Sequence, residues 1–327
     1  MSSEKALIVK LSSLGDLFHA LPAVHALKQT HNWSIDWITQ PEYVPVVQCF
    51  TDIDNVLPFP RRRIIRSGTD WIRALRRKRY DIVIDFQGLL KSALITRLAR
   101  AKQRIGPSWH REGAGIFYSQ VLGHRDKARH AIDEACELAA GLDAPVDSIQ
   151  FPIQFPAHPH ASESPRIAYV PCSRWTTKNA PPSLFAGCIQ ELHRRHGGTA
   201  FLIGSSADRD TANYIQSQVQ DVDLRNVCGT TSLVELGSLL QEMDLVVTVD
   251  SGPMHMAAAL GCPVVALFGP TDPHRTGPYG ETHCIIQRTD LTCVPCHSRR
   301  CQRPQRDHAC MSRWSATDII DSCETLL

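Results

Sequence analysis

Short apolar and β-branched runs alternate along the chain with longer stretches whose apolar positions recur at helical spacing. In the first half the runs read ALIVKL, SIDWIT and DIVIDF, and the stretches 17–30, 43–50 and 89–101 predict helices. This alternation is typical of βαβ units that build a parallel sheet.

The second half repeats this pattern. Its runs read RIAYVP, TAFLIG, LVVTVD and PVVALFG, and the predicted helices are 183–196, 207–220, 233–242 and 254–260. The pattern therefore predicts a second doubly wound α/β layer.

The segment FPIQFPAHPHASESPR separates the halves and is rich in Pro, His and Ser without any period, as linkers are. With 327 residues the chain also exceeds the usual size of one hydrophobic core. We expect a hinge within 152–165 and two Rossmann-like domains, 1–158 and 159–327. Facing each other, they would form a cleft at the carboxyl ends of their strands, where such folds bind ligands.

The apolar run near the N-terminus is too short for a secretion signal or a membrane span, which predicts a cytoplasmic protein. In that reducing compartment most of the 12 cysteines are expected to be buried thiols rather than disulfides.

Positive charge is concentrated between residues 61 and 104, which hold 14 Lys and Arg against 3 Asp and Glu. This excess suits an anionic partner, and a solvated helix face is the other interpretation. Nucleic acid is a poor candidate, because the net charge is only +2 and the basic stretch is not interleaved with aromatic residues.

The first predicted strand runs into KLSSLGD, which places Asp16 where a helix begins. The carboxylate can face the ligand, or it can simply stabilise the start of the helix. Only Gly15 is present where a dinucleotide fingerprint needs three glycines, and no Walker A motif occurs. These absences argue against dehydrogenases and P-loop kinases.

Two loops of the second half carry groups that suit a diphosphate. PCSRWTTKNAPP places Ser173, Thr177 and Lys178 in a turn, where an ammonium could stabilise a departing diphosphate, although exposed loop lysines are common. In VDSGPMH a buried strand ends at Asp250, and the Ser251-Gly252-Pro turn opens a helix whose N–H groups suit an anion. His255 lies one turn into that helix, where it could donate to a phosphate or pack as an ordinary helix residue.

Near the C-terminus four cysteines follow the pattern C-x2-C-x4-C-x8-C: Cys293, Cys296, Cys301 and Cys310. The first pair has metal-ligand spacing, so a structural zinc or iron ion is one interpretation. The later spacings match no zinc ribbon, so free or redox-labile thiols are the other.

The segments SSLGDLFHALPAV, DFQGLLKSALITRLA, SRWTTK and VDSGPMHMAAALGCPVVALFGPTDP, in this order, resemble the lipopolysaccharide heptosyltransferases of glycosyltransferase family nine. The first two are most similar to heptosyltransferase I, which adds the first heptose to Kdo. DSGPMH and the cysteine tail are more similar to heptosyltransferase II.

The resemblance implies a GT-B fold, an acceptor on the first domain, an ADP-heptose donor mainly on the second, and an inverting displacement that requires no divalent ion. It implies Asp16 as general base and Lys178, with Ser173, as the support of the leaving diphosphate. The other implied donor-binding residues are Thr177, Asp208, Asp250, Ser251, Gly252 and His255. The implied acceptor-binding residues are Arg61, Arg62, Arg63, Arg111 and His130.

The implied acceptor is the lipopolysaccharide inner core, as Kdo–lipid A or as a heptosylated core, reached by peripheral contact at the cytoplasmic face of the inner membrane. Three alternatives stay open: a non-catalytic nucleotide-sugar or lipopolysaccharide-binding protein, a family member with another donor or acceptor, and a metal-dependent regulator built around the cysteines.

Overall fold

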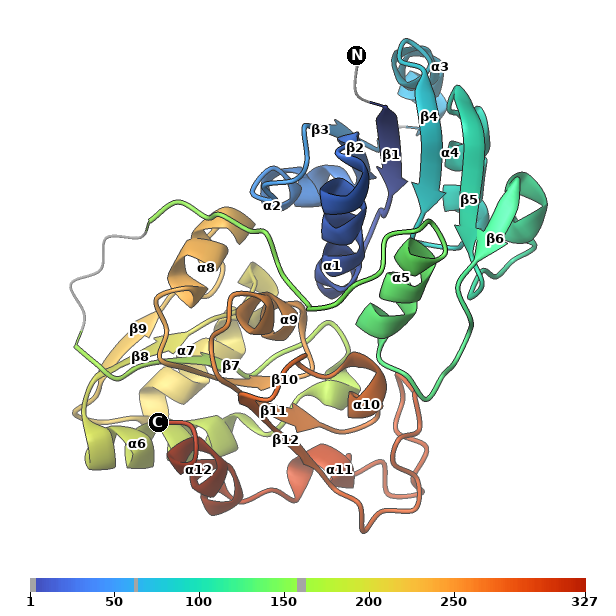
Figure 1. Ribbon diagram of the computed structural model, residues 1–327. Helices are drawn as coiled ribbons and strands as arrows, with labels where there is room; N and C mark the ends of the chain where they lie inside the picture. Colours follow the sequence, from blue (N-terminus) through green and yellow to red (C-terminus); the bar gives the residue numbers. More distant parts are fainter. Residues whose placement is uncertain (1–3, 62–63, 158–162) are drawn as a thin grey trace. The chain divides into compact units, whose positions relative to one another are not determined.

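The structure is a computed structural model that describes residues 4–61, 64–157 and 163–327. The chain divides into two compact units, 1–154 and 155–327, and each contains one parallel sheet (Figure 1). The division falls inside the segment 152–165, where the composition predicts a linker, and four residues before the expected boundary at 158.

The sheet of the N-terminal unit has the order β3-β2-β1-β4-β5-β6, with every neighbouring pair parallel. The order reverses between β1 and β4, and ligands of doubly wound folds bind beside such a reversal. The strands are β1 (Lys5–Val9), β2 (Ser34–Thr39), β3 (Asn55–Pro58), β4 (Tyr80–Asp85), β5 (Ala101–Pro107) and β6 (Gln120–Leu122).

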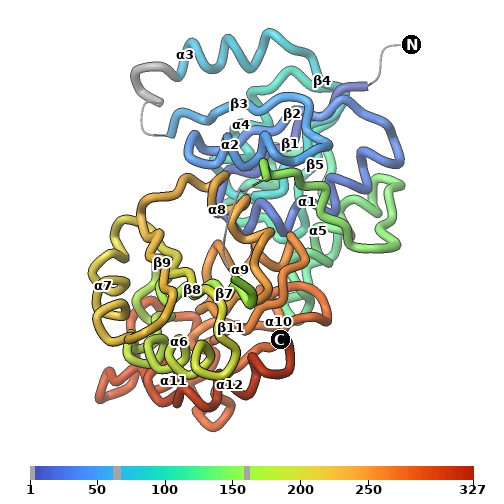
Figure 2. The backbone as a smooth tube through the Cα atoms, turned by 90° about the vertical axis from the view of Figure 1, so that its left-hand side faces the viewer, coloured from blue at the N-terminus to red at the C-terminus, as the bar shows by residue number. Residues whose placement is uncertain are grey.

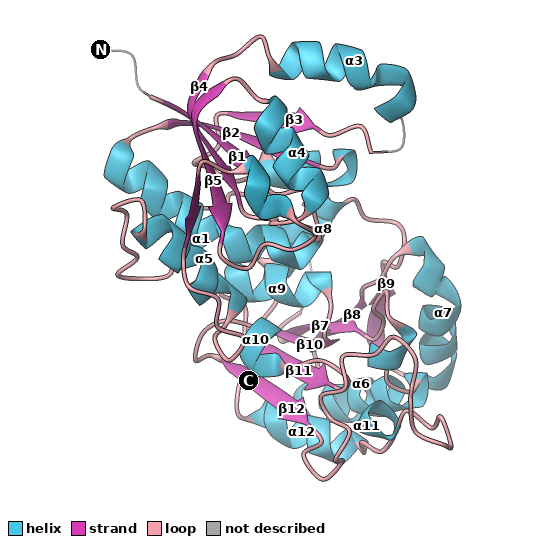
Figure 3. Cartoon of the chain, turned by 90° about the vertical axis from the view of Figure 1, so that its right-hand side faces the viewer, coloured by secondary structure: helices cyan, strands magenta, loops and turns pink. Residues whose placement is uncertain are grey.

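Helices cover both faces of this sheet. Helices α1 and α5 pack side by side on one face, and α4 lies on the other (Figure 3). The helices are α1 (Leu14–His31), α2 (Val44–Val47), α3 (Ile64–Leu75), α4 (Leu90–Leu98) and α5 (Ala131–Ala140), with 3₁₀ turns at Pro41–Tyr43 and Ala114–Phe117.

The C-terminal unit repeats this plan, with a parallel sheet of order β12-β11-β10-β7-β8-β9. The strands are β7 (Arg166–Val170), β8 (Thr199–Leu202), β9 (Asp223–Asn226), β10 (Leu245–Val249), β11 (Val264–Phe268) and β12 (His283–Gln287). Its reversal falls between β10 and β7, the two strands that precede the Asp250 and Lys178 loops.

Figure 2 shows α6 and α12 on one face of this sheet and α8 and α9 on the other. The helices are α6 (Pro182–His196), α7 (Arg209–Gln218), α8 (Leu233–Leu240), α9 (Gly252–Ala259), α10 (Pro273–Thr276), α11 (Ala309–Ser312) and α12 (Ala316–Glu324). Short 3₁₀ turns lie at Thr176–Lys178 and Ser206–Asp208.

The central strands are buried on both faces, which explains why they read as continuous apolar runs in the sequence. Every residue of β10 and β11 is buried, and so are four of the five residues of β1. The predicted two-domain α/β fold is thereby confirmed.

None of the twelve cysteines, all of which lie in the described part of the chain, forms a disulfide. Five of them are buried (Cys172, Cys188, Cys228, Cys262 and Cys323) and the other seven are half-buried, so fewer are buried than the expected majority. Among the described residues, no helix combines the length and the apolar character needed to cross a membrane.

Candidate functional site

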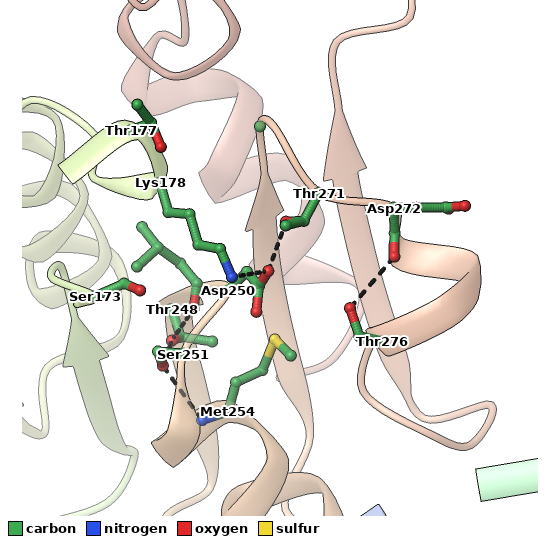
Figure 4. Close-up of polar contacts among 12 residues, drawn as sticks. Ser173, Thr177, Lys178, Thr248, Asp250, Ser251, Met254, Thr271, Asp272 and Thr276 are labelled. Carbon is green, nitrogen blue, oxygen red and sulfur yellow. Dashed lines mark hydrogen bonds and ion pairs between the residues drawn. The ribbon is translucent and has the colours of Figure 1, made fainter. Parts of the chain in front are cut away.

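Three loops that follow neighbouring strands of the C-terminal sheet bring a lysine, a carboxylate and a hydroxyl together (Figure 4). Asp250 directly follows β10, Lys178 follows β7, and Thr271 follows β11. Lys178 Nζ lies 2.5 Å from Asp250 Oδ2, and Thr271 Oγ1 donates to the same oxygen at 2.5 Å. The carboxyl ends of three adjacent strands therefore build one polar cluster.

This cluster is shielded from water, since the side chains of Lys178 and Asp250 are 14% and 7% exposed. Charges attract more strongly where the effective dielectric is low. An ammonium has three N–H donors, and Asp250 accepts one of them. Asp250 and Thr271 thus hold a cation in a fixed place, as a site for a diphosphate requires.

The start of α9 lies beside the cluster. Ser251 caps the helix by accepting from the Met254 N–H at 3.4 Å, and its hydroxyl also contacts Thr248 Oγ1 at 3.1 Å (Figure 4). Ser251 is thus a helix cap, and its implied contact with the donor stays a prediction. His255 is half-buried within α9. The positive end of the helix dipole therefore lies next to Lys178, which favours an anion.

The remaining predicted donor residues differ in their surroundings. The Ser173 N–H donates to Asn179 Oδ1 at 2.8 Å, which closes the lysine loop. The buried Thr177 hydroxyl donates to the Ser298 carbonyl at 3.0 Å, so its hydrogen is used within the protein. Asp208 follows β8 and accepts from the N–H and hydroxyl of Ser205 at 2.8 and 2.7 Å.

Asp16 is half-buried at the start of α1, after β1. Its Oδ2 accepts from the N–H and the hydroxyl of Ser13, at 2.7 and 2.6 Å. Gln87 Oε1 in turn accepts from the N–H groups of Leu11 and Ser12, both at 3.1 Å. Asp16 therefore caps α1, and its contacts with Ser13 hold the carboxylate beside the strand reversal. Its implied role as general base stays a prediction.

Basic side chains gather at the carboxyl ends of the N-terminal strands. Burial and the nearby charge of Arg61 lower the pKa of Lys91, which lies over the Phe59 ring. Arg111 follows β5, and its N–H donates to the Gly88 carbonyl at 2.8 Å. Lys91 thus lies near the charge of Arg61, one of the predicted acceptor residues, whereas Arg62 and Arg63 lie outside the described residues.

His130 caps α5, where its Nδ1 accepts from the Ile132 N–H at 3.1 Å. Its ring lies edge-on to that of His19 of α1, with the centroids 5.4 Å apart. The structure thus places His130 against α1, the helix whose first turn contains Asp16.

A buried carboxylate supports the loop before α4. Asp85 ends β4 and accepts from the N–H groups of Gln87 and Gly88 and from the Tyr118 hydroxyl. Burial raises the pKa of Asp85, and these hydrogen bonds oppose the rise. Gly88 has a φ of +69°, and a Cβ there would lie 2.9 Å from Pro107. Asp85 and Gly88 together shape the loop that leads into α4, whose second residue is Lys91.

Sequence reasoning missed Thr271, Trp175 and Lys91. Thr271 follows the buried strand β11 within FGPTDP, so the rule that selected Asp250 at the end of β10 would also have found it. Lys91 stands within DFQGLLKS and contributes to the positive charge between residues 61 and 104, but nothing in the sequence distinguishes it from the other basic residues there. The Trp175 ring lies close to Lys178 and to Arg299, which is 124 positions further along the chain, and no local pattern indicates such a contact.

The four tail cysteines line a single pocket together with Thr177, Pro270 and His308. Burial raises the pKa of Cys310 to about 11, and the neighbouring Cys296, Cys293 and Cys301 add to the rise. Across the described ranges, no three or more His, Cys, Asp or Glu side chains are arranged to hold a metal ion. A structural metal ion here stays a prediction from the spacing, as does catalysis without one.

Comparisons with known proteins agree with this arrangement. The family model of glycosyltransferase family 9 (heptosyltransferase) matches residues 69–306. The chain is 32% identical to lipopolysaccharide heptosyltransferase 1 of Salmonella typhimurium over 85% of its length and 92% of that protein. It is 28% identical to lipopolysaccharide heptosyltransferase 1 of Pseudomonas aeruginosa over 91% of its length and 87% of that protein.

A solved structure, Escherichia coli heptosyltransferase WaaC with ADP, superposes with a TM-score of 0.80 at 25% identity and covers 99% of this chain and 100% of that one. The two-sheet architecture is thus the GT-B fold of these enzymes. Since the family model matches more than half of the chain, the protein belongs to glycosyltransferase family 9, the heptosyltransferases, and is a glycosyltransferase.

Proposed function

We propose that the protein transfers L-glycero-D-manno-heptose from ADP-heptose to the inner core of lipopolysaccharide. The observation that carries this proposal is the buried Lys178–Asp250–Thr271 cluster beside the start of α9 in a member of family 9. The relatives named above are lipopolysaccharide heptosyltransferases, and WaaC was solved with ADP.

On the donor side, Lys178 would stabilise the negative charge that builds on ADP as the bond between the anomeric carbon and the diphosphate breaks. A cation that is already in place needs little rearrangement during the reaction. Asp250 holds the Lys178 ammonium in place, and Thr271 in turn donates to Asp250. The N-terminus of α9 adds partial positive charge for a phosphate, with Gly252 as its first residue. Asp208, in the loop that follows β8, would contact the ribose or the sugar.

On the acceptor side, Asp16 would take the proton from the acceptor hydroxyl while its oxygen attacks the anomeric carbon. The new C–O bond forms as the bond to the diphosphate breaks, which inverts the anomeric configuration and releases ADP. The Ser13 contacts fix the orientation of the carboxylate that accepts the proton.

The acceptor would be bound by cations, because Kdo carries a carboxylate and lipid A carries phosphates. Arg61, Lys91 and Arg111 supply positive charge after the strands of the N-terminal sheet, and Arg62 and Arg63 follow Arg61 in the sequence. Similarity to two heptosyltransferases of type 1 favours Kdo–lipid A over a heptosylated core. This acceptor would place the enzyme at the cytoplasmic face of the inner membrane.

The release of ADP from ADP-heptose tests this proposal when Kdo–lipid A and a heptosylated core are supplied as separate acceptors. We expect faster release of ADP with Kdo–lipid A than in a control without acceptor, where only hydrolysis of the donor releases ADP. Release of ADP only with the heptosylated core would support heptose transfer but would mean that Kdo–lipid A is not the acceptor. If another nucleotide sugar were turned over and ADP-heptose were not, the proposed donor would be wrong.

Replacing Arg61, Arg62 and Arg63 together by Ala is expected to raise the acceptor KM by about tenfold, because a lost charge-assisted hydrogen bond is worth roughly 1.5–3 kcal/mol. The donor KM should change little, and steady-state kinetics with a deacylated acceptor measures both. A matched triple replacement of the exposed Arg76, Arg77 and Arg79 controls for general charge. Equal increases in both KM values would argue against an acceptor site at this loop.

A further inference from the structure

The tail segment from His297 to Met311 touches both loops that hold the Lys178–Asp250–Thr271 cluster. On the lysine side, the Thr177 hydroxyl donates to the Ser298 carbonyl at 3.0 Å, and Thr177 is 4% exposed. On the other side, the His297 N–H donates to the Pro270 carbonyl at 2.6 Å. Adjacent tail residues are thereby bonded to the neighbours of Lys178 and of Thr271.

The loop that carries Thr271 rests closely on the same tail. A Cβ added to Gly269 would lie 2.5 Å from Met311 Sδ and 3.1 Å from Cys310 Sγ, so a side chain at this position would require Met311 to move. Gln287 fixes the loop from the sheet side, where its Nε2 donates to the carbonyls of Gly269 and Thr271 at 3.2 and 2.8 Å. The position of Thr271 thus depends on the tail and on β12.

Trp175 connects the tail to the ammonium itself. Lys178 Nζ lies 4.8 Å from the centroid of the Trp175 ring, and the Arg299 guanidinium carbon lies 4.7 Å from the same centroid. Cations are attracted to the face of an indole at such distances. One ring therefore contacts both the proposed diphosphate-binding lysine and an exposed tail arginine.

We propose that Arg299 is a positioning residue for the donor site: through Trp175 it fixes the lysine loop, and with it the Lys178 ammonium that binds the donor diphosphate. This inference rests on the proposed function and adds a residue to it. Lys178 is drawn to Asp250 at 2.5 Å and to the Trp175 ring, so the place of the ring helps to set the place of the charge. Misplacement of a binding group by a fraction of an ångström is costly, because its interactions depend steeply on geometry.

The test measures the affinity for ADP by calorimetry, and the KM of ADP-heptose, with the full-length Arg299→Ala variant. Arg300→Ala is the matched control, since Arg300 is also exposed and equally charged, and the hydrogen bonds that it makes with Ser298 come from its backbone. We expect Arg299→Ala to weaken ADP binding and raise the donor KM about five- to twentyfold, with the acceptor KM and Tm unchanged. Arg299→Lys should recover most of the affinity, because it keeps a cation for the ring.

A double-mutant cycle with Trp175→Leu separates positioning from direct contact with phosphate. If Arg299 acts through Trp175, the double variant should bind ADP no more weakly than the weaker single variant. Additive losses would instead mean that Arg299 contacts the donor directly, and they would overturn the inference. So would an Arg299→Ala variant that matches Arg300→Ala, or one whose Tm and two KM values all change together.

ADP binding and heptose transfer by the wild-type protein show whether this inference or the proposed function has failed. If it binds ADP and transfers heptose while Arg299→Ala behaves like the control, the positioning role alone is wrong. If it neither binds ADP nor transfers heptose, the proposed function fails and the inference fails with it.

Discussion

Asp16→Asn is expected to lower kcat for heptose transfer by about 10²- to 10⁴-fold, the range typical of a lost general base. The amide oxygen of Asn can still accept the Ser13 N–H bond, which measures 2.7 Å, so the start of α1 should be kept. The amide cannot take a proton from the acceptor hydroxyl. Rates of ADP release at saturating donor and acceptor measure the effect, and ADP binding should be unchanged.

Asp318→Asn is a matched control for the capping role. Asp318 also stands in the first turn of its helix, α12, and accepts from the N–H and the hydroxyl of Ser315 at 2.8 and 2.7 Å. Replacing Asp318 should weaken the same kind of capping contact as replacing Asp16 does, and it should leave kcat at the wild-type value. An Asp16→Asn enzyme with more than about a tenth of wild-type kcat would mean that the base lies elsewhere, since base catalysis contributes at least about 10².

Lys178→Ala is expected to lower kcat by about 10²- to 10³-fold and to weaken ADP binding, because the charge on the departing diphosphate loses its partner. The change also leaves Asp250 buried without its cation. Breaking one side of a buried ion pair costs about 3–5 kcal/mol, so Tm should fall as well. Thermal unfolding and single-turnover rates measure the two effects separately.

The double variant Lys178→Met, Asp250→Asn removes both charges and so separates stability from catalysis. We expect it to recover much of the lost Tm, because no unpaired charge remains buried, while transfer stays slow. If transfer recovered together with Tm, Lys178 would serve only stability. Wild-type kcat in Lys178→Ala would exclude it from the chemistry altogether.

The predicted strands match the structure because a buried parallel strand must be apolar along its whole length. The same logic located Asp250, which directly follows β10, and the loop after β7 that ends in Lys178, since the loops after such strands lie at the ligand-binding edge. Their pairing was not predictable, because it depends on β10 lying between β7 and β11. Local periodicity carries no information on strand order.

The predicted helix 43–50 differs from the structure in its length. The structure has a 3₁₀ turn at Pro41–Tyr43 followed by the short α2, Val44–Val47. Pro41 and Pro45 stand at the starts of these two elements, where a missing N–H costs nothing. The apolar spacing correctly predicts helical structure here, but the α-helix covers only 44–47 of the predicted 43–50.

The role of the cysteine tail depended on contacts between distant parts of the chain. The Thr177–Ser298 bond joins residues 121 positions apart, and the tail has few regular elements whose periodicity could reveal its packing. From the sequence it was an isolated structural segment with metal-like spacing. In the structure it supports both loops of the proposed donor site.

The most direct test of the central claim is the mass of the acceptor after incubation of the purified protein with ADP-heptose and Kdo–lipid A. The account predicts that Kdo–lipid A gains the mass of one heptose, that ADP appears in equal amount, and that Asp16→Asn forms far less product. An acceptor of unchanged mass, with wild-type protein that is folded and binds ADP-heptose, would contradict the claim that this chain transfers heptose to Kdo–lipid A.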